Sequence, residues 1–115
     1  MTDNVIKDKS YKFALEIIVF CKILKEKKEY QLSDQLLRAG TSIGANVEEA
    51  LSGQSRKDFV SKMAVATKEA REANYWLRLI YDAKIITNYK AKELIQESEV
   101  IKKILIKIVK TSSEE

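Results

Sequence analysis

Residues 32–53, LSDQLLRAGTSIGANVEEALSG, form the stretch that decides the fold of this sequence. At 100° per residue its apolar positions fall on one face of a helix. These positions are Leu32, Leu36, Ala39, Gly40, Ile43, Val47, Ala50 and Leu51. Two glycines in the middle, Gly40 and Gly44, each cost a helix about 1 kcal/mol relative to alanine. A helix that keeps them usually has another backbone close by, so we predict a close helix–helix contact here.

A polar stripe runs beside this apolar face, rotated by about a quarter turn or more. It begins at Gln35 and continues through four residues that we call the polar seam. The polar seam consists of Arg38, Ser42, Asn46 and Glu49. In one interpretation it is a hydrogen-bonded seam, buried between helices or subunits, that fixes their register. In the other it contacts a ligand or a nucleic acid.

The overall composition favours long helices. The chain has 115 residues, no proline and only three glycines, with 45% hydrophobic and 33% charged residues. This length suits a single domain with a real core, and this composition is typical of helices rather than sheets. The sequence therefore predicts an all-α fold.

The absence of histidine excludes several kinds of chemistry. Di-iron bundles need Glu-x-x-His pairs, and nucleophilic catalysis commonly needs a histidine base. No Gly-rich phosphate loop follows a strand. Glu48, Glu49, Glu69 and Glu72 are therefore interpreted as solvated or paired charges. We expect no enzyme activity, no catalytic residue, no metal and no cofactor.

The distribution of apolar residues indicates a soluble, cytoplasmic protein without membrane contact. The longest uninterrupted apolar run, from Ile17 to Cys21, is far too short to span a bilayer. The N-terminal residues are polar, with no hydrophobic signal region. Cys21 is the only cysteine, and we predict a buried, unreactive thiol.

Four helices follow from periodicity and capping signals, over residues of about 4–26, 33–52, 56–83 and 88–110. The proposed N-caps are Asp3 or Asn4, Ser33, Ser55 with Asp58, and Thr87 or Asn88. Gly53 is expected to end the second helix in a left-handed conformation. Short turns between long helices predict an up-down-up-down antiparallel four-helix bundle, with residues 1–115 as one domain.

Two helices carry a seam of regularly spaced apolar residues. The third-helix seam consists of Phe59, Met63, Ala66, Ala70, Ala73, Leu77 and Ile80. The fourth-helix seam consists of Ala91, Leu94, Ser98, Ile101, Leu105 and Ile108. Because the centre of the third-helix seam is alanine, we expect it to pack against the small residues of the second helix.

Further apolar residues lie outside these seams. The first helix is apolar on one side at Ile6, Phe13, Ile17, Phe20 and Leu24, and on the other at Tyr11, Ala14, Leu15 and Ile18. The third helix has a spare strip at Val65, Trp76 and Leu79. One bundle core covers only one face of each helix, so the spare faces predict a homo-oligomer whose interface includes this strip.

Basic residues gather where the predicted bundle would have its two ends. Lys25, Lys27 and Lys28 are expected near one end, and Arg56 and Lys57 near the other. The net charge of +4 is only mildly basic. These side chains are either a solvated surface, diluted by acidic neighbours, or contacts to the phosphates of RNA or DNA.

Three runs of the sequence resemble the 23S rRNA intervening-sequence protein family, also called S23-like proteins. They are LSDQLLRAGTSIGANVEEA at 32–50, SRKDFVSKM at 55–63 and KEAREANYWLRL at 68–79. The resemblance covers nearly the whole chain, although Ala50 stands where the family often has glycine. It implies a small bacterial four-helix bundle protein that assembles as a homopentamer. A related protein, the accessory variability determinant of diversity-generating retroelements, is a basic pentameric barrel that binds a reverse transcriptase and nucleic acid.

Two classes of function follow. The first is a non-enzymatic oligomeric scaffold that binds RNA or DNA, or a protein that handles them. The second is a structural assembly with a protein partner and no nucleic acid. Binding to RNA that weakens steeply as salt rises would separate the first class from the second.

Overall fold

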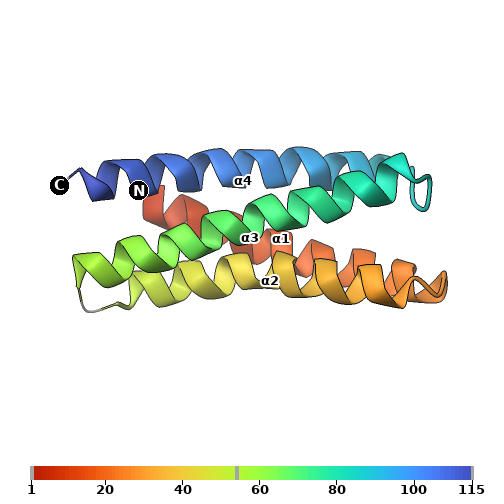
Figure 1. The fold of residues 1–115 in the computed structure, drawn as a ribbon, viewed down its shortest axis with the longest axis horizontal. Coiled ribbons are helices and arrows are strands. Elements are labelled where there is room, and N and C mark those ends of the chain that lie inside the picture. The colour runs from red at the N-terminus through yellow and green to blue at the C-terminus, as the bar shows by residue number, and fades with distance from the viewer. Residues whose placement is uncertain (1, 54, 115) are drawn as a thin grey trace.

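Four antiparallel α-helices make up the fold (Figure 1). The computed structural model describes residues 2–53 and 55–114, with side chains from residue 5 onward. The helices are α1 (Thr2–Glu26), α2 (Tyr30–Leu51), α3 (Arg56–Asp82) and α4 (Tyr89–Ser113). Successive helices pack together and α1 also packs against α4, while the diagonal pairs stay apart within the described residues. The up-down-up-down bundle is confirmed, and both chain ends lie at the same end of it.

The predicted seams line the core. Every seam residue of α4 is buried, and so is every seam residue of α3 except Phe59, which packs partly buried against the core. The inner face of α1 is buried as predicted at Ile6, Phe13, Ile17 and Leu24. The one polar member of the α4 seam, Ser98, accepts a hydrogen bond from the Asn74 amide at 2.9 Å. This buried pair ties α3 to α4 at a single register.

The prediction that Ser33 caps the second helix is wrong. The helix begins at Tyr30, and Ser33 lies buried inside it. The Ser33 hydroxyl donates to the Cys21 carbonyl at 3.1 Å, and the Cys21 thiol faces the Ser33 carbonyl at 3.5 Å. Ser33 thus joins α2 to α1, and the tight turn that precedes it starts the helix early.

Lysines, and not glycine, adopt the left-handed conformation at the helix ends. Lys28 and Lys84 have φ of 65° and 62°, whereas no described glycine has a positive φ, so the prediction for Gly53 is wrong. Directly after Lys28 in sequence, the Glu29 amide donates to the Leu24 carbonyl at 2.9 Å. Directly after Lys84, the Ile85 amide donates to the Ile80 carbonyl at 3.1 Å. These hydrogen bonds form Schellman motifs, which offset the left-handed strain.

The glycines of α2 face α1, so the expectation that they meet the alanines of α3 is wrong. A Cβ added to Gly40 would lie 2.9 Å from side-chain carbons of Ile17. A Cβ added to Gly44 would lie 3.4 Å from the carbonyl oxygen of Ser10. The close approach predicted from the sequence is therefore present, but its partner is α1.

The remaining boundaries are close to those expected. Ser55 accepts from the Asp58 amide and Asn88 accepts from the Ala91 amide, which confirms both caps. Helix α4 continues to Ser113, three residues further than predicted. Helix α1 begins at Thr2, before Asp3 and Asn4, whose side chains lie outside the described part. None of the described helices is both long and apolar enough to cross a membrane.

Candidate functional site

The polar seam lies along the side of α2 that faces α3. The Ser42 hydroxyl donates to the Arg38 carbonyl at 2.6 Å, and the Asn46 amide donates to the Ser42 carbonyl at 2.9 Å. The two charged residues instead reach α3, where Glu49 pairs with Lys62 at 3.1 Å. The middle of the seam therefore bonds to its own helix, and its two ends connect α2 to α3.

Arg38 organises the largest ion-pair cluster at this interface. Its guanidinium donates to Glu69 at 3.1 Å and also to Glu72. Glu72 accepts a second hydrogen bond from the Trp76 indole N–H at 3.1 Å. The Glu69 side chain is only 12% exposed, so Arg38 neutralises a carboxylate with little access to water. The geometry supports the register-fixing interpretation of the seam, since these charges are satisfied within one chain.

Replacing Arg38 with alanine should lower the free energy of unfolding by about 1–2 kcal/mol, between the values for exposed and buried ion pairs. Stability is lost because Glu69 and Glu72 lose their cation. The loss stays moderate because Arg38 is half-exposed, so water already weakens its ion pairs. Chemical denaturation measures the change. Lys62→Ala is the matched control, because its partner Glu49 is exposed and the loss should stay under about 0.5 kcal/mol. Equal effects of both variants would contradict a special role for Arg38.

The basic residues singled out in the sequence lie at opposite ends of the bundle. Lys25, Lys27 and Lys28 are exposed at the α1–α2 turn, while Arg56 and Lys57 are exposed at the start of α3. Arg56 donates to the Ser112 carbonyl of α4 at 3.4 Å. The structure therefore gives two separate basic regions.

The predicted interface strip lies on the outer surface of α3. Val65 and Leu79 are exposed, whereas Trp76 is partly buried against the core of its own bundle. A larger apolar surface lies on the outer side of α1, where Tyr11, Leu15, Ile18 and Val19 are exposed. We call these four residues the α1 strip. Because α1 and α3 are diagonal in the bundle, the two surfaces lie on opposite corners.

A groove between α3 and α4 was not singled out in the sequence. It is lined from α4 by Ile106, Val109 and Lys110, and from α3 by Ala64, Thr67, Lys68, Arg71, Glu72 and Tyr75. Four of the α3 residues, Ala64, Lys68, Arg71 and Tyr75, recur at spacings of four and three, beside the alanine seam. A basic and aromatic stripe at that spacing is the signal that could have revealed the groove.

The described residues contain no group of three or more carboxylate or thiol side chains placed to hold a metal ion. The buried Cys21 is poorly suited to nucleophilic chemistry. Burial raises the pKa of its thiol to about 11, despite the hydrogen bond with Ser33, which lowers it. The thiol is therefore protonated at neutral pH.

Comparisons with known proteins identify related chains. Residues 2–107 match the family model described as 23S rRNA-intervening sequence protein. A crystal structure of a protein of unknown function from the S23 ribosomal protein family of Bacteroides thetaiotaomicron is 48% identical in sequence. The match covers 96% of this chain and 99% of that one, with a TM-score of 0.91. No curated protein matches the chain.

Proposed function

Because this chain belongs to the 23S rRNA-intervening sequence protein family, we propose that it is a non-enzymatic bundle that self-assembles and binds nucleic acid. The α1 strip is the observation that carries the assembly. Tyr11 and Leu15 are 60% and 50% exposed, although both residues lie in the middle of a long helix. Such a contiguous apolar surface is typical of a protein–protein contact.

The positions of the two apolar surfaces favour a closed ring. The second apolar surface consists of the exposed α3 residues Val65 and Leu79. It differs in composition from the α1 strip, and the two surfaces lie on opposite corners of the bundle. Contact between one surface of a protomer and the other surface of the next is heterologous, and such contacts close into rings when the rotation allows. The family resemblance adds five as the number of subunits. A ring also multiplies any weak charged surface on each protomer.

Exposed basic side chains support nucleic acid as the ligand. The sequence has 21 basic and 17 acidic residues, and ion pairs occupy many of the acidic ones. Several lysines and arginines are exposed on the surface of the bundle. Phosphate contacts of this kind give affinity without requiring sequence recognition.

Fluorescence anisotropy with a labelled single-stranded RNA tests the proposal. We expect binding whose affinity falls steeply between low and physiological salt, because bound cations release counterions from the strand. A single-stranded DNA of the same length shows whether the sugar matters. Absence of binding to both strands at low salt would remove the nucleic-acid part of the proposal.

A protein scaffold without nucleic acid is the second candidate. It is favoured by the polar seam, which is satisfied within the chain, and by the small net charge. In that case the same apolar surfaces would hold the assembly together and the exposed cations would only keep it in solution. The anisotropy experiment separates the two candidates.

A further inference from the structure

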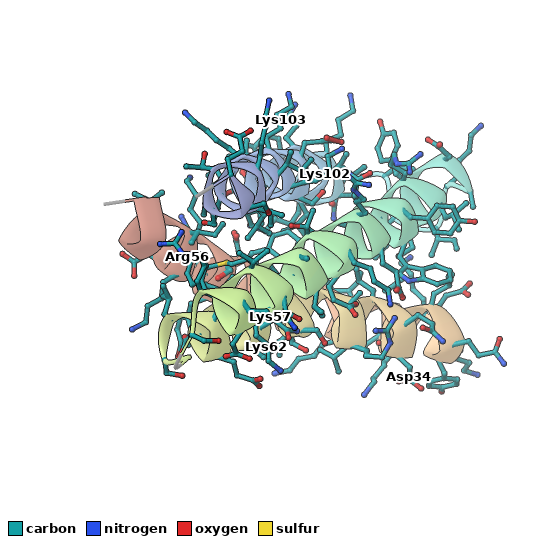
Figure 2. All side chains as sticks on the ribbon, turned by 60° about the vertical axis from the view of Figure 1, so that its left-hand side comes forward. Asp34, Arg56, Lys57, Lys62, Lys102 and Lys103 are labelled. Carbon is teal, nitrogen blue, oxygen red and sulfur yellow. The ribbon has the colours of Figure 1, made fainter. Side chains whose placement is uncertain are left out.

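Positive charges outnumber negative ones along the groove between α3 and α4. Lys68, Arg71 and Lys110 line its main part. A second hollow, lined by Arg56, Lys57 and Ser112, lies on the same two helices and continues the groove toward the chain ends. Figure 2 shows Arg56 and Lys57 on α3, with Lys102 and Lys103 on α4. The two hollows together contain five cations and one carboxylate, whereas the whole chain is nearly balanced.

The single carboxylate of the groove is already engaged elsewhere. Glu72 is held by Arg38 of α2 and by the Trp76 indole N–H. Glu99 of α4 lines neither hollow and pairs with Lys102 at 2.7 Å, and the hydrogen bond from Lys102 lowers the pKa of Glu99. Within the described part of the chain, Lys68, Arg71 and Lys110 make no ion pair. The positive electrostatic potential of these three cations is therefore not offset by ion pairs within the described part, and it can attract an anionic ligand.

The groove also offers apolar and aromatic surface. Ala64, Ile106 and Val109 line it, and Tyr75 contributes a half-exposed ring. That ring is held in place by Trp76, whose centroid lies 5.2 Å away in an edge-on arrangement, and by the Arg78 guanidinium at 5.8 Å. These apolar side chains and the face of the tyrosine ring suit the flat surface of an unstacked nucleobase. In a duplex that surface is covered by the neighbouring bases, so the groove suits a single strand.

We propose that the α3–α4 groove binds single-stranded nucleic acid, with Lys68, Arg71 and Lys110 on the phosphates and Tyr75 stacked on a base. This rests on the proposed function and assigns the site to this groove instead of the α1–α2 turn. From Ala64 to Tyr75 the groove follows α3 for about 16 Å at the helical rise. Arg56 and Lys57 extend the track for the phosphates beyond it.

Two variants of equal charge locate the site. The first replaces Lys68, Arg71 and Lys110 with glutamine, and the second replaces Lys25, Lys27 and Lys28. Affinity for a short oligouridine RNA and for oligothymidine DNA is measured against salt. The groove variant should flatten the log–log salt slope by about 2, since each phosphate contact on a single strand contributes about 0.7. The turn variant should keep the parental slope. Circular dichroism and light scattering establish that both variants keep the parental fold and mass.

Tyr75 distinguishes a nucleic acid from an acidic protein. Tyr75→Ala should weaken the binding of both oligonucleotides by about 5- to 150-fold, the usual effect of losing one stacked base, while Tyr75→Phe should bind like the parent. Emission of the only tryptophan, beside Tyr75, should change when the strand binds. Polyglutamate should bind more weakly and without dependence on Tyr75.

Three results would overturn the assignment. An unchanged slope for the groove variant, with a flattened slope for the turn variant, would place the site at the turn. Polyglutamate binding as tight as RNA binding, together with no effect of Tyr75→Ala, would make the groove a site for acidic protein. No binding of either oligonucleotide by the parent protein would refute the proposed function itself and the groove with it.

Discussion

Replacing Gly44 with leucine should lower the free energy of unfolding by about 1–3 kcal/mol or more, the usual cost of overpacking. Gly44 is buried in α2, and a Cβ at this position would already touch the backbone of Ser10 in α1 at 3.4 Å. Backbone cannot rotate out of the way as a side chain can, so the longer leucine must push the two helices apart. Chemical denaturation at a fixed protein concentration measures the loss.

Two alanine variants sharpen this prediction. Gly44→Ala fits at ordinary contact distance and gains helix propensity, so it should be neutral or stabilising by up to about 1 kcal/mol. Gly40→Ala should destabilise, because its Cβ meets the fully buried and β-branched Ile17 at 2.9 Å. A Gly44→Leu variant with the parental midpoint would show that α1 and α2 do not approach closely at this point.

Replacing Leu15 with glutamate should reduce the mass of the particle from that of an oligomer toward the 13.2 kDa of one chain. Leu15 lies within the α1 strip, between Tyr11 and Ile18. If a neighbouring protomer covers the strip, the new carboxylate would be buried without a partner, which costs several kcal/mol unless the contact opens. Light scattering at micromolar concentration measures the mass directly.

The matched control for this variant is Tyr89→Glu. Tyr89 is 79% exposed at the start of α4 and is not part of the α1 strip, so the substitution should leave the mass unchanged. Loss of mass for Leu79→Glu as well as Leu15→Glu would support a heterologous contact between the two apolar surfaces. A parent protein of one chain mass would refute the assembly, and a dimer would refute the ring.

The bundle could be predicted from the sequence because helical periodicity is a local property of the chain. Spacings of three and four place Met63 and Leu77 on one face, and any stable bundle must bury that face. The caps at Ser55 and Asn88 are equally local, since each side chain bonds to an amide three residues away. For the same reason the seam of α4 was predicted residue by residue, including the polar Ser98.

The partners of these faces were decided by tertiary packing. Nothing within α2 distinguishes α1 from α3 as the neighbour of Gly40 and Gly44, because both helices carry small residues at suitable spacing. The same holds for the start of α2, where a serine that resembles a cap is buried against Cys21 once the preceding turn closes around Lys28. Capping and core packing compete for the same small polar residue, and only the assembled bundle shows which one prevails.

The candidate site shows the same division. The sequence by itself determined that Arg38 and Glu49 share one stripe of a helix and that basic residues gather near the two ends of the bundle. Only the tertiary structure decided that Arg38 pairs with Glu72 of α3. It also decided that Lys68, Arg71 and Lys110, which make no ion pair with the described residues, line one groove. The physical reason is that charge pairing depends on distances of a few ångströms between helices, whereas periodicity specifies only the direction in which a side chain leaves its own helix.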